Sequence, residues 1–298
     1  MQNRILLLIT ICLSLILLFM SSSDTTLFNT KANINVKDTD TNKITSIELE
    51  EYIIGVVAAE MPASFNEEAL KAQAIASRTY AIYKMQTSNG DYDVVTDVSN
   101  QGYITKEEMK DKWGSEFNKY YEKIKNIVND TKGKIMLYND EVIEAYYFAM
   151  SNGYTEEAGL VFSENKDYLQ SVKSIYEDEN LKIFEVKKEM TKDSICKKLE
   201  ITCDDLNISN VVRSDTGRVN TLKINNISFK GTEVRKKLEL RSTDFDIEIN
   251  NDLVTITTIG YGHGVGMSQY GANGMAKAGY NFEEILKYYY KNIEISSI

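Results

Sequence analysis

Residues 46–83 constrain the fold most, because the only proline of the chain separates two helical patterns there. In SIELEEYIIGVVAAE, apolar residues recur at helical spacing along one stripe, and Glu60 extends that stripe. Pro62 disfavours helical backbone at the preceding residue, so the first helix should end there. Ser64 followed by Glu67 predicts a capping box that opens a second helix. The second helix carries a face of small residues and tyrosines suited to close packing: Ala69, Ala72, Ala76, Tyr80 and Tyr83.

The remaining pattern predicts an α+β class, with mixed helices and short antiparallel strands around a substrate cleft. TKEEMKDKWGSEFNKYYEKIKNIVNDTKG reads as a helix that stops at Gly133, and KIMLYNDEVIEAYYFAMSNGYT reads as a hairpin. Residues 176–258 change character, with many charges and short alternating strands, and predict a strand-rich sub-domain. Its first charged run, EDENLKIFEVKKEM, reads as a solvated face. A glycine-rich loop and a helix close the chain.

The N-terminus predicts a membrane anchor over residues 1–22. Arg4 precedes an uncharged apolar run from Ile5 to Met20, and no small-residue cleavage site follows. Spanning helices need roughly 17–25 residues, so the run favours an uncleaved anchor but leaves cleavage open. With Arg4 inside, the rest of the chain lies outside the cytoplasm. Residues 23–43 are polar without a period and predict a tether, so residues 44–298 form the main domain.

Charge and cysteine usage exclude several classes. The formal net charge of −10 argues against a nucleic-acid partner, because no face easily carries a continuous basic stripe. One histidine and two cysteines outside the apolar run, Cys196 and Cys203, do not make a zinc site. Whether these two cysteines pair is open, since two free thiols fit the spacing equally well. We therefore expect no metal and no cofactor.

Glu60 is the strongest single candidate for chemistry. Burial on an apolar stripe and the negative end of a helix dipole both raise the pKa of a carboxyl, as a general acid requires. A glutamate that turns to solvent at a helix end fits the sequence as well. Asp97 follows a strand in VVTDVSNQGY and is a candidate partner in a two-carboxylate glycosidase, or a surface loop aspartate.

His263 lies in GYGHGVGMSQYG, where five glycines crowd one segment. The spacing is not that of a dinucleotide or phosphate loop, so nucleotide binding is rejected. Two interpretations stay open: a tight turn that holds His263 in the core, or a loop that lines a cleft with Ser268, Gln269 and Tyr270. Ser151 has no visible base beside it, which argues against a serine nucleophile.

These segments resemble the stage II sporulation protein D family, the lytic transglycosylases of septal peptidoglycan in endospore formers. The matching blocks run from about residue 44 to 292; the most specific are EEYIIGVVAAEMPASFNEEALKAQAIASRTYA and GYGHGVGMSQYGANGMAKAGYNFEEILKYYYKNI. The resemblance implies that Glu60 is the catalytic acid and base. It also implies that eight residues bind substrate in or beside the cleft: Gln73, Arg78, Gln101, Ser151, His263, Ser268, Gln269 and Tyr270. The chain departs from the family at Ser151-Asn152-Gly153, where the family has SGG, and it lacks the cysteine and histidine with which some members hold zinc near that turn.

The resemblance implies cleavage of the bond between N-acetylmuramic acid and N-acetylglucosamine, in strands without stem peptides, to give 1,6-anhydro ends. It places the protein in the cell membrane as a single-pass protein of the sporulation septum, acting in engulfment beside a wall amidase and other membrane proteins. Two alternatives remain. One is a two-carboxylate hydrolase, and the other is a non-catalytic wall-binding module that modifies an amidase.

Overall fold

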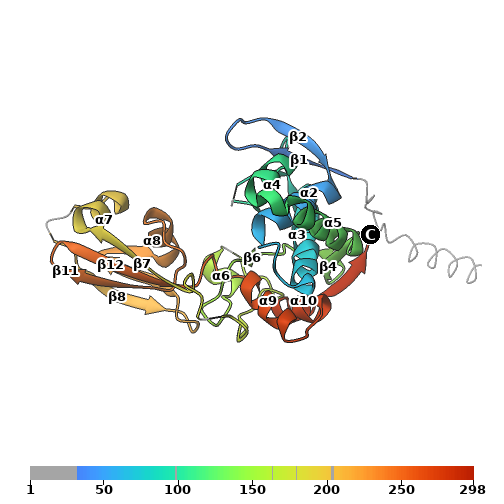
Figure 1. Ribbon diagram of the computed structural model, residues 1–298. Coiled ribbons are helices and arrows are strands. Elements are labelled where there is room, and N and C mark those ends of the chain that lie inside the picture. Colours follow the sequence, from blue (N-terminus) through green and yellow to red (C-terminus); the bar gives the residue numbers. More distant parts are fainter. Residues whose placement is uncertain (1–31, 98, 163, 179, 203–204) are drawn as a thin grey trace, which may run out of the picture.

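The computed structural model describes residues 32–97, 99–162, 164–178, 180–202 and 205–298. The predicted anchor at residues 1–22 lies outside them. Within the described ranges, no helix is long and apolar enough to cross a membrane. The described chain forms a helix-rich part and a strand-rich part that lie apart in Figure 1. The α+β class is thus confirmed.

The helix-rich part is built around one long, buried helix, α3. Helices α2, α5, α9 and α10 and strand β4 all pack against it. The helices of this part are α2 (Leu49–Glu60), α3 (Glu67–Thr87), α4 (Lys106–Trp113), the short 3-10 turn η1 (Gly114–Glu116), α5 (Phe117–Asp130), α6 (Ala158–Val161), α9 (Gln269–Lys277) and α10 (Phe282–Tyr289). The small residues Ala69, Ala72 and Ala76 are fully buried on α3, which confirms the predicted packing face.

Three small sheets flank these helices. Their strands are β1 (Asn33–Lys37), β2 (Ile44–Glu48) and β3 (Val94–Val95); β4 (Lys134–Tyr138), β5 (Glu141–Val142) and β14 (Glu294–Ser297); and β6 (Tyr147–Phe148) with β13 (Met267–Ser268). The pairs β1–β3 and β13–β6 are parallel, so the expectation of antiparallel strands holds only in part. The β13–β6 pair joins the glycine-rich loop to the segment before Ser151.

The tether prediction is wrong for residues 33–37. These residues form β1, and Ile34 and Val36 are 0% and 3% exposed in the main core. Their alternation is the period-two signal of a half-buried strand, and it was hidden in a polar sequence. The folded region therefore begins before residue 44.

Two local predictions are also corrected. Helix α3 begins at Glu67, and its N-cap is Asn66, whose side chain accepts from the Glu68 N–H. Ser64 instead lies in the turn in which the Phe65 N–H donates to the Pro62 carbonyl, at 2.9 Å. The predicted helix before Gly133 is interrupted at Gly114, whose φ of +51° lies outside the helical region.

The strand-rich part has its own buried core, from Met190 to Ile256. It comprises β7 (Glu185–Thr191), α7 (Lys192–Leu199), β8 (Ile208–Arg213), β9 (Val219–Ile224), β10 (Ile227–Lys230), α8 (Gly231–Lys237), β11 (Phe245–Asn250) and β12 (Leu253–Ile259). Two sheets, β10-β9-β8 and β11-β12-β7, carry the strands. Cys196, buried in α7, is disulfide-bonded. This core is separate from that of the helix-rich part.

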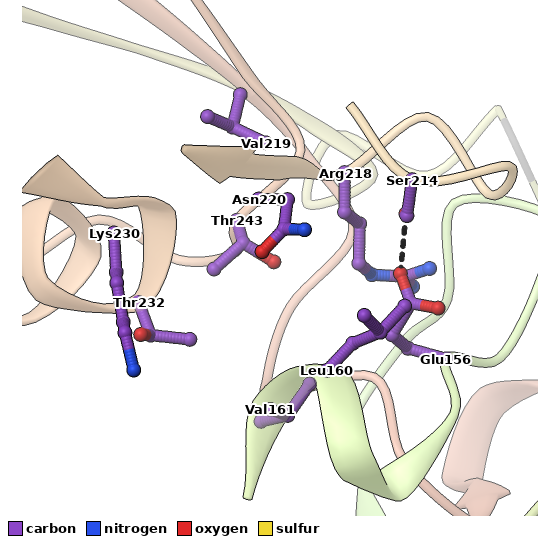
Figure 2. A pocket seen from close by; sticks show the side chains of 10 residues that line it. All are labelled: Glu156, Leu160, Val161, Ser214, Arg218, Val219, Asn220, Lys230, Thr232 and Thr243. Carbon is purple, nitrogen blue, oxygen red and sulfur yellow. Dashed lines mark hydrogen bonds between the residues drawn. The ribbon is translucent and has the colours of Figure 1, made fainter. Parts of the chain in front are cut away.

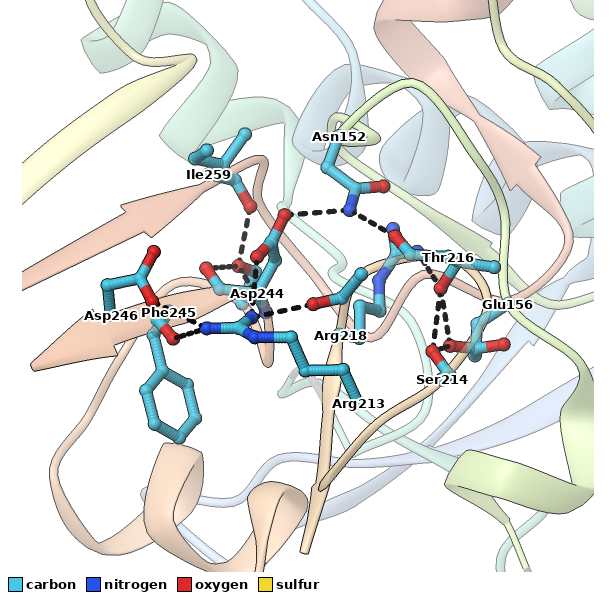
Figure 3. A network of polar contacts seen from close by, with 12 residues as sticks. Asn152, Glu156, Arg213, Ser214, Thr216, Arg218, Asp244, Phe245, Asp246 and Ile259 are labelled. Carbon is cyan, nitrogen blue, oxygen red and sulfur yellow. Dashed lines mark hydrogen bonds and ion pairs between the residues drawn. The ribbon is translucent and has the colours of Figure 1, made fainter. Parts of the chain in front are cut away.

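A polar network joins the two parts, as Figure 3 shows. The Asn152 amide donates to Asp244 and to the Thr216 carbonyl, both at 2.8 Å. The Glu156 carboxylate accepts from the Ser214 and Thr216 hydroxyls at 2.5 and 2.6 Å. Asn152 has no positive φ, whereas Gly153 has a φ of +104°. The asparagine in this turn therefore needs no glycine-like backbone, and its side chain ties the two parts together.

Candidate active site

Glu60 is the last residue of α2, and its carboxylate is held from two sides. The Gly102 N–H donates to Oε1 at 2.6 Å, and the Gln269 amide donates to Oε2 at 3.1 Å. Met61 has extended backbone at the C-cap, as expected before Pro62. Both carboxylate oxygens thus accept hydrogen bonds from protein groups, and the alternative of a glutamate that turns to solvent is wrong.

Burial raises the pKa of the Glu60 carboxyl. The hydrogen bonds from Gly102 and Gln269 and the charge of Lys112 oppose this shift, but the net direction is upward. The proton therefore stays on Glu60 to higher pH than on an exposed glutamate, while two donors stand ready to stabilise the carboxylate. This combination suits a group that first donates and then accepts a proton.

The Lys112 side chain caps the C-terminal end of α2. Its ammonium donates to the Ala58 carbonyl at 2.8 Å and to the Ala59 carbonyl at 3.4 Å. A cation at a helix C-terminus satisfies free carbonyls and offsets the negative end of the dipole. Lys112 thereby fixes the turn that carries Glu60.

A chain of buried polar groups lies behind the carboxylate. The Gln269 amide also approaches the Gln73 Oε1 at 3.5 Å, and Gln73 donates to the Ser77 hydroxyl at 3.0 Å. The Tyr147 hydroxyl donates to Gln101 Oε1 at 2.7 Å, and Gln101 donates to the Tyr52 hydroxyl at 3.1 Å. Gln73 and Gln101 are 0% and 1% exposed, so they orient the site from behind and do not reach a ligand.

A cleft of about 560 Å³ opens in front of Glu60. The helix-rich part contributes Trp113 and Tyr120 to its wall, and the strand-rich side contributes Ile183, Arg241 and Tyr261. The full lining is Ala59, Glu60, Met61, Pro62, Ala63, Ser64, Lys112, Trp113, Tyr120, Ala149, Ile183, Arg241, Tyr261, Gln269 and Tyr270. Its size and its aromatic rings are typical of a binding site for an organic ligand.

The pocket in Figure 2 lies at the junction of the two parts, between Glu156, Arg218 and Lys230. Its volume is about 20 Å³, which is room for roughly one water molecule. It cannot admit a sugar ring, whereas the Glu60 cleft, at about 560 Å³, can.

Of the eight predicted binding residues, only Gln269 and Tyr270 line the cleft. The Tyr270 ring packs edge-on against Phe65, with centroids 5.0 Å apart. The other six residues lie elsewhere, and each has a structural partner.

Arg78 does not face the cleft. It is 0% exposed, and its guanidinium forms a two-point ion pair with Glu50, at 2.9 and 2.6 Å. It also donates to the carbonyls of Val128 and Lys134. The prediction that Arg78 binds substrate is wrong, because its buried guanidinium is used to join α3 to α2, α5 and β4.

Ser151 and Ser268 converge on a buried carboxylate, Glu177. Its Oε1 accepts from the Ser151 N–H at 3.2 Å, from the Ser174 hydroxyl at 3.0 Å and from the Ser268 hydroxyl. Burial raises the pKa of Glu177 despite these bonds. Both serines are 0% exposed, so neither binds substrate, and the solvated-face prediction is wrong for Glu177.

His263 packs among the rings of Tyr146, Phe148 and Phe162 and does not line the cleft. Its Nδ1 accepts from the Val265 N–H at 3.1 Å. Burial lowers the pKa of His263 to about 3, so the ring stays neutral. The tight-turn interpretation holds for His263, and the cleft interpretation holds for Gln269 and Tyr270.

Asp97 does not serve Glu60 as a second acid here. It is exposed and accepts from the Ser99 N–H at 2.8 Å and from the Ser99 hydroxyl. These bonds lower the pKa of Asp97. It is absent from the cleft lining.

Five charged or aromatic residues of the lining were not predicted as site residues: Lys112, Trp113, Tyr120, Arg241 and Tyr261. Trp113, the only tryptophan of the chain, was a usable signal. Arg241 and Tyr261 are far from Glu60 in sequence, and no local pattern links them to it. Across the described ranges, no group of three metal-binding side chains occurs.

Comparison with known proteins identifies relatives of the chain. A family model described as Stage II sporulation protein matches residues 37–138. The chain is 42% identical to Stage II sporulation protein D of Bacillus subtilis (strain 168), over 91% of this chain and 81% of the relative. It is 39% identical to the protein of that name in Bacillus amyloliquefaciens, over 92% and 81%. It is also 30% identical to Amidase enhancer of Bacillus subtilis (strain 168), over 82% of this chain and 40% of the relative.

Proposed function

Because the chain belongs to the stage II sporulation protein D family, we propose that it is a lytic transglycosylase of peptidoglycan in sporulating cells. The observation that carries the proposal is one carboxyl of raised pKa, Glu60, in a cleft lined by aromatic rings. Among the described residues that line this cleft, Glu60 is the only carboxylate. A reaction that needs one acid and base fits this set.

In the proposed reaction, protonated Glu60 gives its proton to the glycosidic oxygen, O4, which joins C1 of N-acetylmuramic acid to C4 of N-acetylglucosamine. The C1–O4 bond breaks, and N-acetylglucosamine leaves with a 4-hydroxyl. The Glu60 carboxylate then takes the proton of the muramyl 6-hydroxyl, whose oxygen bonds to C1. The product is a 1,6-anhydro end, and Glu60 is protonated again.

The donors around Glu60 support both steps. The Gly102 N–H and the Gln269 amide stabilise the carboxylate between the two proton transfers. Because these donors are fixed by backbone and by buried side chains, they need no rearrangement during the reaction. The nucleophile belongs to the substrate, so no second protein carboxylate and no ordered water are required.

The cellular setting is part of the same proposal. The septal membrane is the location that the apolar N-terminal run and the sporulation family favour. A wall amidase that removes stem peptides first is the expected partner, and the relative named Amidase enhancer supports such an association.

That relative also favours a second candidate function, a non-catalytic module that stimulates an amidase. The hydrolase alternative has less support, since Asp97 lies outside the cleft lining and is held by Ser99.

Product analysis separates these functions. Glycan strands with and without stem peptides are incubated with the protein, and the released fragments are identified by mass spectrometry. We expect 1,6-anhydro ends from wild type and from Asp97→Asn. Ordinary reducing ends, with Asp97→Asn inactive, would support the hydrolase. No cleavage, with amidase stimulation that survives Glu60→Gln, would support the module.

A further inference from the structure

The cleft in front of Glu60 is positively charged, although the chain carries a formal net charge of −10. Among the described residues of its lining, the charged ones are Glu60, Lys112 and Arg241. The proposed reaction requires a protonated Glu60 at its start. In that state the charged side chains of the lining are two cations, which favours an anionic ligand.

The two cations are not equivalent. Lys112 already donates to the carbonyls of Ala58 and Ala59 at the end of α2. The Arg241 guanidinium has no hydrogen-bond or ion-pair partner anywhere in the described chain. It lies in the loop between α8 and β11, on the strand-rich side of the cleft. Arg241 is therefore the cation that is available to a ligand.

The Arg241 guanidinium lies against an aromatic ring. Its central carbon lies over the Tyr261 ring, 5.1 Å from the ring centroid, and Tyr261 also lines the cleft. Stacking on an aromatic face restrains a guanidinium while its edge N–H groups stay free to donate. The Arg241 carbonyl accepts from the Gly262 N–H at 2.9 Å, which fixes the loop against the next segment. Such a group matches a carboxylate through two parallel hydrogen bonds.

We propose that Arg241 is a specificity-determining residue that binds the free lactyl carboxylate of N-acetylmuramic acid. This inference rests on the proposed function, because it names the feature of the glycan that the same cleft selects. A lactyl group without a stem peptide ends in a carboxylate. When a peptide is attached, that group is a neutral amide. Arg241 thereby distinguishes stripped strands from peptide-bearing ones.

Binding is measured with the full chain carrying Glu60→Gln, so that strands stay intact. One ligand is peptide-free glycan with free lactyl carboxylates. The matched ligand is the same glycan with those carboxylates converted to methylamides. We expect the amidated strands to bind about tenfold more weakly, since a charge-assisted hydrogen bond is lost.

Adding Arg241→Gln should weaken binding of the carboxylate strands about tenfold and leave binding of the amidated strands unchanged. Arg241→Lys keeps the charge but loses the planar donors. Its affinity for the carboxylate strands should therefore lie between those of the parent protein and of Arg241→Gln. Lys187→Gln, an exposed charge on β7, is the control and should leave both affinities as they are.

Equal weakening of both ligands by Arg241→Gln would overturn the inference, as would equal affinity of the parent protein for both ligands or no glycan binding at all. Cleavage is not part of this measurement. A wild-type protein that binds selectively but forms no anhydro ends would refute the proposed reaction and leave the role of Arg241 intact.

Discussion

Replacing Glu60 by glutamine keeps the size and shape of the side chain but removes its proton. The Gly102 N–H, 2.6 Å from Oε1, is a backbone donor that cannot turn. The new amide must therefore place its oxygen there and its NH₂ toward Gln269. In the wild-type protein the Gln269 amide donates to Glu60 at 3.1 Å. In the variant the Gln269 amide must flip, so that its oxygen accepts from the new NH₂ group. The flip gives up the long contact to Gln73, at 3.5 Å.

The structural cost of this rearrangement is small. At most one neutral hydrogen bond is lost, about 0.5–1.5 kcal/mol. This loss is opposed by a gain, because the substitution removes a carboxyl whose ionised form is disfavoured by burial. The folded state raises the pKa of Glu60, so wild-type stability falls as pH rises above the unfolded pKa and through the folded one. Glu60→Gln has no carboxyl to ionise at this position, so it does not lose stability in this way. Its stability relative to wild type should therefore increase from pH 5 to pH 8.

The catalytic cost is large. General acid and base assistance contributes about 10²–10⁴-fold in rate, or about 3–5.5 kcal/mol at 1.36 kcal/mol per factor of ten. One group serves both steps here, so we expect the upper end. Glu60→Asp keeps the acid but withdraws the carboxyl from the Gly102 N–H, and it should retain more activity than Glu60→Gln.

The assay is the release of anhydro ends from peptide-free strands, followed by chromatography, with urea unfolding at pH 5 and pH 8 on the same samples. A folded Glu60→Gln protein with near wild-type turnover would refute the catalytic role. A relative stability that decreases toward pH 8 would refute the account of the buried carboxylate.

The other predictions concern two buried carboxylates, Glu50 and Glu177, and metal binding. Arg78→Gln leaves Glu50 buried without its partner, so urea unfolding should show a loss of about 3–5 kcal/mol, while the KM of the folded fraction stays unchanged; a raised KM at full stability would restore a binding role. Glu177→Gln removes a second carboxyl of raised pKa, so its stability relative to wild type should increase as pH rises above about 5 in the same unfolding assay. A pH-independent difference would count against that reasoning. Activity should survive extensive dialysis against EDTA, because we expect no metal; a loss that zinc reverses would contradict this.

Local sequence patterns were enough to predict the segment that carries the acid. The apolar stripe of α2 ends at Glu60, and Pro62 stops the helix there, both for reasons contained within fifteen residues. The alanine face of α3 is equally local. The local pattern was wrong where two possible N-cap residues lie close together. Asn66 caps α3, while Ser64 lies in the turn after Pro62.

The environment of Glu60 was decided only by the tertiary structure. Its two donors come from Gly102 and Gln269, 42 and 209 residues away along the chain. Arg241 enters the cleft from a part with a separate core. Glu177 lies in a charged run that looked solvated, yet packing buries it beneath the N-terminus of α9. Periodicity reports which face of one element is buried. Which polar groups meet depends on how distant elements pack around α3, and no single stretch of sequence contains that information.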